Sequence, residues 1–231
     1  MHRPRVLVAD DDPIVVKFVS AILRNEGCDI LTATDGAAAL EAVEREIPDL
    51  VILDIVMPKV DGLEVCRRLR EWAQIPIIML SVRGDVSDKV RCLNLGADDF
   101  VTKPFAVDEL IARVKSVLRR ARMPDEAHEP ASFIRGNIEI DLLRRRVAVA
   151  GKEIRLTPTE YMLLQELVSN AGKVLSHTHL LGRVWGTEYV EDRQFLHVFI
   201  SRLRTKLEAD PQNPEYITTV SGVGYLFKDA W

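Results

Sequence analysis

The sequence predicts a doubly wound α/β domain with a five-stranded parallel sheet, followed by a smaller α+β domain. In the first 120 residues, short β-branched runs alternate with longer amphipathic stretches, which is typical of strands joined by crossover helices. Several of these runs are apolar throughout, as expected where helices cover both faces of a sheet. After a proline-containing segment the pattern changes to short runs separated by glycine turns. The 231 residues are enough for two domains that each bury a core.

The expected strands of the first domain cover residues 6–9, 29–33, 50–53, 77–80 and 100–102. Helical patterns lie between them, among them residues 14–25 and 107–120. Asp12 stands directly before Pro13, and a polar N-cap residue followed by a first-turn proline is a typical helix start. We expect this domain to span residues 1–121.

The segment 119–132, RRARMPDEAHEPAS, combines two prolines and mixed charges without apolar periodicity. It predicts an exposed linker, with the domain boundary drawn at residues 122–131. The second domain then spans residues 132–231.

Short antiparallel strands with turns at residues 135–137 and 150–152 open the second domain. Thr157, Pro158 and Glu160 predict a capped helix start ahead of the apolar run YMLLQELV. Helical patterns follow at residues 176–185 and 192–208, and YITTVSGVGYLF predicts a closing hairpin around residues 221–224. A small sheet, three helices and a terminal hairpin together indicate a winged helix.

Composition excludes several classes of protein. With 47% hydrophobic and 29% charged residues, the chain is neither disordered nor fibrous. Its N-terminus carries an apolar run of only four residues, which predicts neither a secretion signal nor a membrane anchor, so we expect a cytoplasmic protein. Three cysteines without CxxC spacing favour small buried side chains over disulfides or a zinc site. The net charge is −4, so DNA binding must depend on where charges lie.

Reactive side chains follow four of the predicted parallel strands: Asp10 and Asp11, Asp54, Ser81, and Lys103. The carboxyl ends of parallel strands meet at one edge, so we expect these groups to converge. Clustered carboxylates favour a hard cation such as Mg²⁺, and a lysine beside them suits a phosphoryl oxygen. A run of aspartates alone usually marks a solvated turn, but the agreement of four strand ends favours phosphoryl transfer onto Asp54.

The motifs VLVADDDP, VILDIVMP, IIMLS and GADDFVTKPF resemble the receiver domain of bacterial response regulators, over residues 3 to about 121. The resemblance implies a flavodoxin-like fold in which Asp54 accepts a phosphoryl group from a sensor histidine kinase. It also implies that Asp10, Asp11, Asp54 and the backbone carbonyl of Val56 hold Mg²⁺.

The same resemblance assigns roles to the ends of the fourth and fifth strands. Lys103, preceding a cis Pro104, would pair with the phosphoryl group, and Ser81 and Phe100 would form the switch pair. Phe100 stands where close relatives commonly have tyrosine, so a hydroxyl contact is missing there.

Residues 192–208 predict an amphipathic helix with a basic outer face. Its expected apolar side comprises Leu196, Phe199, Ile200, Leu203 and Leu207, and its expected exposed side comprises Gln194, His197, Val198, Ser201, Arg202 and Thr205. No acid occurs from Arg193 to Leu207, which suits a phosphate-lined groove, and an exposed valine suits a thymine methyl group. For this helix taken alone, a merely solvated basic face is the alternative.

LTPTEYMLLQELVSNAGKVLSHTHLLGRVWG, the following helix and GVGY resemble the OmpR/PhoB class of response regulators over residues 132–229, and YVEDRQFLHVFISRLRTKLE is most similar to its KdpE-type members. The resemblance implies binding to direct-repeat promoter half-sites, with the recognition helix in the major groove and the wing at the minor groove. The residues implied in DNA binding, from the resemblance and from the helix pattern, are Trp185, Arg193, Gln194, His197, Val198, Ser201, Arg202, Arg204, Thr219 and Tyr225.

Two positions depart from the class. Ser221 replaces a wing arginine, and His177 replaces an arginine ahead of the second helix that contacts phosphate, so those roles are not carried over. His177 and His179 form an HxH pair, but two ligands without a third make a metal site improbable.

The resemblance also implies a symmetric receiver dimer on phosphorylation. Intermolecular pairs Lys89 to Glu109 and Asp99 to Arg113 would surround an apolar patch. The implied interface residues are Lys89, Val90, Leu93, Asp99, Glu109, Ile111 and Arg113.

Three hypotheses follow. The leading one is a phosphorylation-controlled transcription factor with RNA polymerase as a further partner and no enzymatic role beyond its own aspartyl phosphorylation and dephosphorylation. A Mg²⁺-dependent phosphohydrolase like the haloacid-dehalogenase phosphatases needs a second acid two residues after the nucleophile, where this chain has Val56. A DNA-binding regulator with a vestigial receiver is disfavoured by the intact set of acidic, hydroxyl and lysine residues.

Overall fold

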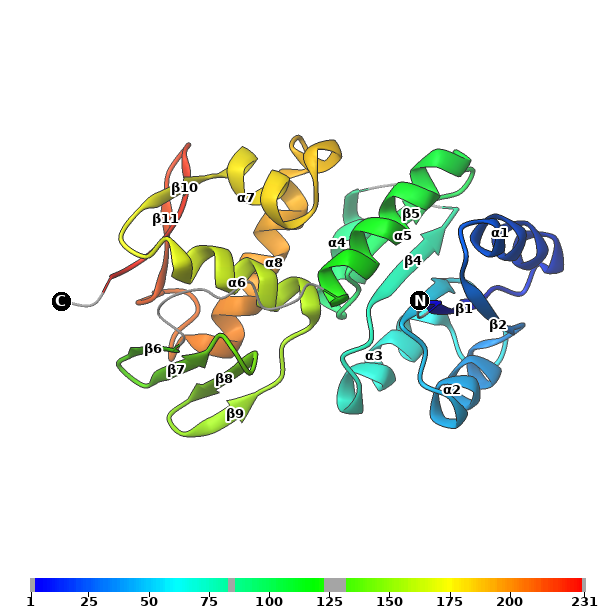
Figure 1. Ribbon diagram of the computed structural model, residues 1–231, viewed down its shortest axis with the longest axis horizontal. Coiled ribbons are helices and arrows are strands. Elements are labelled where there is room, and N and C mark those ends of the chain that lie inside the picture. The colour runs from blue at the N-terminus through cyan, green and yellow to red at the C-terminus, as the bar shows by residue number, and fades with distance from the viewer. Residues whose placement is uncertain (1–2, 83–85, 123–131, 230–231) are drawn as a thin grey trace. The chain divides into compact units, whose positions relative to one another are not determined.

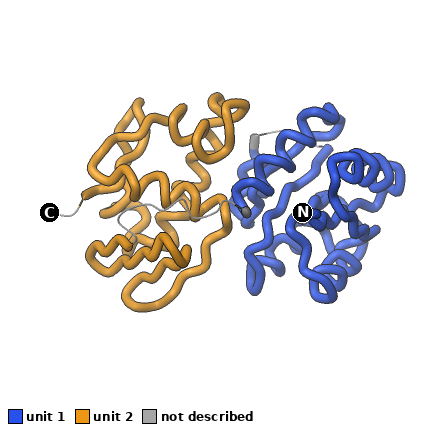
Figure 2. Tube along the Cα trace, viewed as in Figure 1, with its two compact units in different colours: residues 1–121 blue, residues 122–231 orange. Residues whose placement is uncertain are grey.

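The computed structural model describes residues 3–82, 86–122 and 132–229. The chain divides into two units, residues 1–121 and 122–231 (Figure 2). Of the predicted linker, residues 123–131 lie outside the described residues. The preceding helix α5 (Val107–Arg122) continues past residue 119 and buries Arg120 completely, so the prediction of an exposed segment from residue 119 is wrong at this end. The reason is that Arg120 lies inside the first unit, bonded to Ser116 and 3.9 Å from the carboxylate of Asp99.

Five parallel strands alternate with helices in the first unit, which confirms the predicted α/β fold (Figure 1). The strand order is β2-β1-β3-β4-β5, so the chain reverses direction of travel across the sheet after β2. The elements are β1 (Arg5–Ala9), α1 (Pro13–Asn25), β2 (Asp29–Ala33), α2 (Gly36–Arg45), β3 (Leu50–Asp54), α3 (Gly62–Trp72), β4 (Ile77–Ser81), α4 (Val86–Asn94), β5 (Asp99–Thr102) and α5.

Aspartates start three of these helices. Asp12 accepts a hydrogen bond from the backbone N–H of Ile14, and Pro13 occupies the first turn of α1, as predicted. Asp35 and Asp61 cap α2 and α3 in the same way. Each of these capping aspartates follows a strand. Some of the acidic residues at the carboxyl edge of the sheet therefore serve to start helices.

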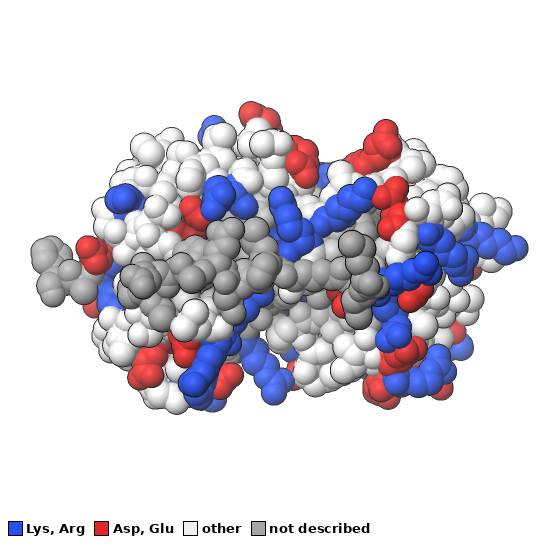
Figure 3. Space-filling view, in the orientation of Figure 1, with Lys and Arg blue, Asp and Glu red and all other residues white. Residues whose placement is uncertain are grey.

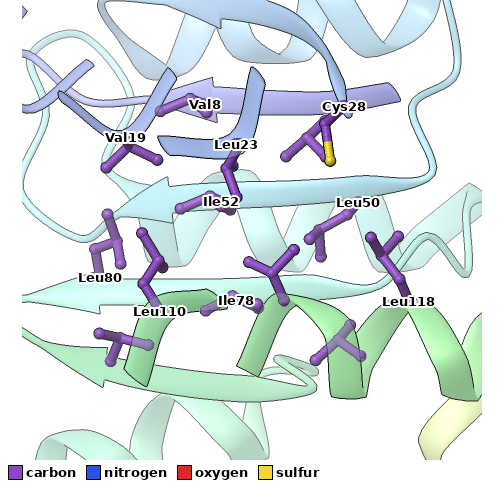
Figure 4. Packing of buried hydrophobic residues seen from close by; sticks show 14 residues of the cluster. Val8, Val19, Leu23, Cys28, Leu50, Ile52, Ile78, Leu80, Leu110 and Leu118 are labelled. Atoms are coloured by element: carbon purple, nitrogen blue, oxygen red, sulfur yellow. The ribbon is translucent and has the colours of Figure 1, made fainter. Parts of the chain in front are cut away.

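The core of this unit lies between the sheet and the helices α1 and α5. Leu23 of α1, Ile52 and Ile78 of the central strands and Leu110 of α5 are completely buried and point toward one another (Figure 4). Every residue of β3 and β4 is buried, as their uninterrupted apolar sequences predict. The sheet that carries the site residues is therefore held on both faces.

Within residues 132–229 the second unit contains two antiparallel sheets and three α-helices, which confirms the predicted winged helix. One sheet has the order β6-β7-β8-β9 and the other the order β10-β12-β11. The elements are β6 (Ser132–Arg135), β7 (Ile138–Asp141), β8 (Arg146–Val149), β9 (Lys152–Ile154), α6 (Pro158–Ser169), β10 (Val174–Ser176), α7 (His177–Val184), the 3₁₀ helix η1 (Thr187–Tyr189), α8 (Arg193–Leu207), β11 (Ile217–Val220) and β12 (Gly224–Phe227).

The start of α6 has the predicted capping box, in which Thr157 and Glu160 bond each other's backbone N–H groups. Strand β10 was absent from the predicted elements. Its three residues pair with β12, and Ser176, predicted as the first helical residue, instead ends the strand and caps α7. So short a strand shows no periodicity in the sequence.

No helix within residues 3–82, 86–122 and 132–229 combines the length and apolar character that crossing a bilayer requires.

Replacing Ile52 by alanine tests the core. We expect Ile52→Ala to lower the free energy of unfolding by about 2–5 kcal/mol, because it removes a completely buried side chain and leaves a cavity. Ile47→Ala is the matched control, since Ile47 is 65% exposed, and it should change stability by less than about 0.5 kcal/mol. Urea unfolding followed by circular dichroism measures both. Equal effects of the two substitutions would contradict the packing.

Candidate functional site

Lys103 joins two of the aspartates at the carboxyl edge of the parallel sheet. Its Nζ atom lies 2.5 Å from Oδ2 of Asp10 and 2.5 Å from Oδ1 of Asp54. Both carboxylates are almost completely buried, whereas Asp11 is exposed. The structure thus brings together residues that are 93 and 49 positions apart in the sequence.

The other oxygen of each buried carboxylate is held by backbone. The N–H of Asp12 donates to Oδ1 of Asp10 at 3.0 Å, and the N–H of Val56 donates to Oδ2 of Asp54 at 2.7 Å. Gly62 supports this geometry, because a Cβ atom there would lie 1.9 Å from the carbonyl oxygen of Asp54. The close approach of α3 to the end of β3 therefore requires glycine at this position.

The ligand oxygens of Asp10, Asp11 and Asp54 all lie within 4.8 Å of one another. Three carboxylates offer the hard oxygen donors that Mg²⁺ prefers. One of them is exposed, which leaves room for the waters that Mg²⁺ retains. The donor set fits the divalent cation that the sequence predicts.

The pKa values of Asp54 and Lys103 are both raised, although burial acts on the two groups in opposite directions. Burial, aided by the nearby charge of Asp10, raises the pKa of Asp54 despite the opposing hydrogen bond and charge of Lys103. Burial by itself lowers the pKa of Lys103, but the hydrogen bonds to Asp10 and Asp54 outweigh it, so the pKa is raised. The lysine is therefore firmly cationic beside a carboxylate whose charge is costly to bury.

Ser81 and Phe100 lie on the two strands beyond β3. Ser81 directly follows Leu80, the register partner of Asp54, and its carbonyl oxygen accepts a hydrogen bond from the N–H of Lys103 at 2.6 Å. Phe100 is buried, with Nζ of Lys89 5.9 Å from its ring centroid. The Lys103–Pro104 peptide bond is cis, as the resemblance implies.

The charged residues implied in dimerisation are partly paired within the chain. Asp99 is completely buried and contacts Arg113 at 3.1 Å, and Arg113 also bonds Glu109 one turn earlier on α5. The pair Asp99 to Arg113, implied as intermolecular, is thus intramolecular in this structure. Leu93 is buried inside the unit, whereas Val90 and Ile111 are partly exposed.

Helix α8 presents five exposed polar side chains: Arg193, Gln194, His197, Ser201 and Thr205. Val198 is only 7% exposed, so the expectation of an exposed methyl group there is wrong. The buried side of α8 is wider than the predicted apolar face, since Phe195 and Val198 are buried as well, and the ring of Phe195 lies 5.7 Å from that of Tyr189 in η1. Figure 3 shows acidic and basic side chains interspersed on one face of the protein. The affinity of a charged ligand must therefore depend on where the charged side chains lie and not on the net charge.

Arg202, predicted as a DNA contact, forms an ion pair inside the protein. Its Nη2 atom lies 2.7 Å from Oε1 of the completely buried Glu160, and Nζ of Lys206 lies 2.6 Å from Oε2. Burial alone raises the pKa of Glu160, but the charges of Arg202 and Lys206 outweigh it and hold the pKa below its ordinary value. The sequence identified Glu160 as a capping residue and missed this second role, since nothing local marks a pair 42 positions apart.

Two side chains of α8, Arg204 and His197, hold it to the C-terminal hairpin. Arg204 donates to the carbonyl oxygen of Ile217 and to Oγ1 of Thr219, both at 2.9 Å. Nδ1 of His197 lies 2.6 Å from the hydroxyl of Tyr225, whose side chain is buried. Trp185 is completely buried against Phe199, with ring centroids 5.1 Å apart, so its indole ring is part of the core.

Comparison with known proteins assigns both units. Residues 6–115 match the family described as response regulator receiver domain, and residues 151–227 match the family described as transcriptional regulatory protein, C terminal. The chain is similar to the transcriptional regulatory protein KdpE of Mycobacterium tuberculosis, at 41% identity over 96% of this chain and 98% of the relative. It is also similar to the sensory transduction protein RegX3 of Mycobacterium bovis, at 42% identity over 95% and 97% of the two chains.

A crystal structure of DrrB from Thermotoga maritima, described as an OmpR/PhoB homolog, covers 99% of this chain and 100% of that one, with a TM-score of 0.53 and 32% identity. An acidic sheet edge with its lysine and a winged helix thus occur in one chain together with both family matches and full-length relatives. The chain therefore belongs to the response regulators of the OmpR/PhoB class and is a phosphorylation-regulated transcription regulator.

Proposed function

We propose that Asp54 accepts a phosphoryl group from a sensor histidine kinase, and that the phosphorylated chain dimerises and binds direct-repeat promoter half-sites. The observation that carries the proposal is the ammonium of Lys103, 2.5 Å from Asp54, at an edge that also holds Asp10 and Asp11. Phosphoryl transfer needs a nucleophile and fixed positive charge, and this edge supplies both.

In the proposed reaction an oxygen of Asp54 attacks phosphorus while the bond from phosphorus to the kinase histidine breaks. The N–H of Val56 and the ammonium of Lys103 each bond one oxygen of Asp54, which fixes the orientation of the carboxylate for the attack. Lys103 then pairs with a phosphoryl oxygen, and Ser81 donates a hydrogen bond to another. Asp10, Asp11, Asp54 and the carbonyl of Val56 would hold Mg²⁺, which would supply further positive charge for the phosphoryl oxygens.

The response to phosphorylation is proposed to pass through Phe100 to the face formed by α4, β5 and α5. Movement of Ser81 toward the phosphoryl group favours the buried position of Phe100. In the dimer, Lys89 pairs with Glu109 of the second copy, and Asp99 exchanges its intramolecular partner for Arg113 of that copy. Asp99 stays paired in both states, which keeps the cost of the exchange low.

Dimerisation places two DNA-binding units on adjacent half-sites at high effective concentration. The exposed residues of α8, with Arg193 and Gln194 at its start, are proposed to enter the major groove. Arg204, bonded to Ile217 and Thr219, holds the helix to the hairpin, and Arg204 and Thr219 are proposed as further DNA contacts. RNA polymerase is proposed as the partner that binds the complex with DNA.

The first prediction concerns the metal ligands. Asp11→Asn should weaken Mg²⁺ binding at least about tenfold, because one charged ligand becomes neutral. Asp12→Asn is the control within the same run of aspartates, since Asp12 caps α1 and asparagine caps equally well. Isothermal titration of each protein with MgCl₂ measures the affinities. Loss of affinity in both variants alike would contradict the assignment.

The second prediction concerns the phosphoryl acceptor. With acetyl phosphate and Mg²⁺, the wild type should acquire one phosphoryl group and elute earlier from a size-exclusion column, whereas Asp54→Asn should do neither. Intact mass spectrometry detects the adduct, which is labile to hydroxylamine if it is an acyl phosphate. An unchanged adduct on Asp54→Asn places the acceptor elsewhere, and an adduct without a change in elution contradicts the dimer alone.

The third prediction concerns the recognition helix. Arg193→Ala should weaken binding to double-stranded DNA and reduce the slope of log K against log salt concentration by about one, because one phosphate contact is lost. Arg183→Ala on α7 removes the same charge from another exposed site and should leave the slope unchanged. Fluorescence anisotropy at several salt concentrations measures the slopes. The same slope change in both variants would show that only net charge matters.

A further inference from the structure

The segment that follows Asp54, residues 55–61, forms a loop between β3 and α3. The N–H of Gly62 donates to the carbonyl oxygen of Ile55 at 2.9 Å and so joins the two ends of the loop. Val56 lies in this loop. Its N–H bonds Oδ2 of Asp54, and its carbonyl oxygen is proposed to bind Mg²⁺. The conformation of the loop therefore determines where this carbonyl group lies relative to the aspartates.

Lys59 occupies the centre of a three-residue turn in the loop. The N–H of Val60 donates to the carbonyl oxygen of Pro58 at 2.8 Å, and Lys59 between them has a positive φ of 66°. A γ-turn with a positive φ at its central residue is rare, and it is strained for a residue with a side chain. Such a conformation persists only where contacts from the surrounding structure hold it.

The N-terminus of α2 supplies such contacts. Nζ of Lys59 lies 2.6 Å from Oδ2 of Asp35, and the other oxygen of that carboxylate accepts the capping hydrogen bond from the N–H of Ala38. A Cβ atom at Gly36 would lie 2.0 Å from the carbonyl oxygen of Val60, so only glycine allows α2 to approach the loop this closely. The turn is thus held against α2 both by its side chain and by its backbone.

The ion pair joins a surface residue to a buried one. The side chain of Asp35 is 9% exposed, whereas that of Lys59 is 67% exposed. The hydrogen bond from Lys59, followed by that from the N–H of Ala38, holds the pKa of Asp35 below its ordinary value, so this carboxylate is charged at neutral pH. Without Lys59, a nearly buried charge would keep only its backbone hydrogen bonds, and the turn would lose its side-chain contact with α2.

We propose that Lys59 is a positioning residue for phosphoryl transfer, which by pairing with Asp35 holds the loop in the conformation that places the carbonyl of Val56 for Mg²⁺. The inference rests on the proposed function and adds to it a residue that contacts neither the metal nor the phosphoryl group. Because the turn is strained, loss of the pair lets the loop relax. Mg²⁺ demands nearly ideal octahedral geometry, so a displaced carbonyl oxygen is a poorer ligand.

A second ion pair of the chain provides a matched control, since many exposed pairs contribute nothing measurable. Nζ of Lys115 lies 2.6 Å from Oε2 of Glu26, and the side chain of Lys115 is 64% exposed. Distance and exposure are therefore almost the same as for Lys59. Lys115 lies inside helix α5, and Glu26 follows α1, which begins at the carboxyl edge of the sheet and ends at the opposite edge.

The test measures Mg²⁺ affinity by isothermal titration of the full chain with MgCl₂. Lys59→Met should raise Kd about tenfold, whereas Lys59→Arg, which keeps the charge, should restore most of the affinity. Asp35→Asn retains the helix cap but loses the charge, so it should raise Kd as Lys59→Met does, and the double variant should be no weaker than either single variant. Lys115→Met should bind as the wild type does.

The rate of adduct formation with acetyl phosphate, followed by intact mass spectrometry at increasing MgCl₂, separates positioning from a general loss of structure. Lys59→Met should need more MgCl₂ for half of its maximal rate but should reach the maximal rate of the wild type. The reason is that Asp54 and Lys103 remain in place and only the metal affinity falls. A lower maximal rate with an unchanged MgCl₂ requirement would overturn the inference.

The inference is also overturned if Lys59→Met binds Mg²⁺ as the wild type does, if Lys115→Met loses the same affinity, or if Lys59→Arg is as weak as Lys59→Met. Asp35→Asn keeps the test decisive if Lys59→Met folds poorly, because wild-type affinity in that variant also contradicts the positioning role. A wild type that neither binds Mg²⁺ nor forms the adduct would contradict the proposed function. A wild type that does both, beside an unaffected Lys59→Met, contradicts only this inference.

Discussion

The positive charge of Lys103 between two buried carboxylates is the interaction on which the first unit depends. A parallel sheet directs the ends of all its strands to one edge, so residues that are distant in the sequence meet there. Asp10 and Asp54 would repel each other without a cation between them, and the ammonium at 2.5 Å from each offsets that repulsion. Chemistry at Asp54 that changes the charge of this group therefore alters the balance for every residue in contact with it.

Most residues at this edge could be predicted, because their positions follow from where each parallel strand ends in the sequence. Buried strands are recognised in the sequence by their length and their β-branched content. The residues that follow such a strand must lie at the carboxyl edge of the sheet. The capping roles of Asp12 and Thr157 were equally accessible, since each depends on residues at most three positions away. The flavodoxin-like fold and the winged helix could be predicted for the same reason, and both are confirmed.

What the sequence could not predict is contacts between elements that are far apart. Val198 lies on the polar side of an isolated helical wheel, but it is buried in the folded unit. Arg202 has the charge that suits a DNA contact, and only the fold shows that it pairs with Glu160. Asp99 and Arg113 likewise have charges that suit a dimer, and their contact inside one chain depends on the path of α5 beside β5. In each case tertiary packing decides the role, and local periodicity does not encode it.

Glu160 both caps α6 and pairs with two basic residues of α8. The side chains that hold α8 in place are therefore different from those that face outward. Arg202 and Lys206 pair with this carboxylate, and Arg204 bonds the hairpin, so the orientation of α8 does not depend on Arg193, Gln194 or Ser201. Those exposed positions are free to change identity without loss of folding. If the outer face of α8 reads the operator, as proposed, a duplicated gene can acquire a new operator sequence by substitution there, while the buried carboxylate of Glu160 keeps α8 in place.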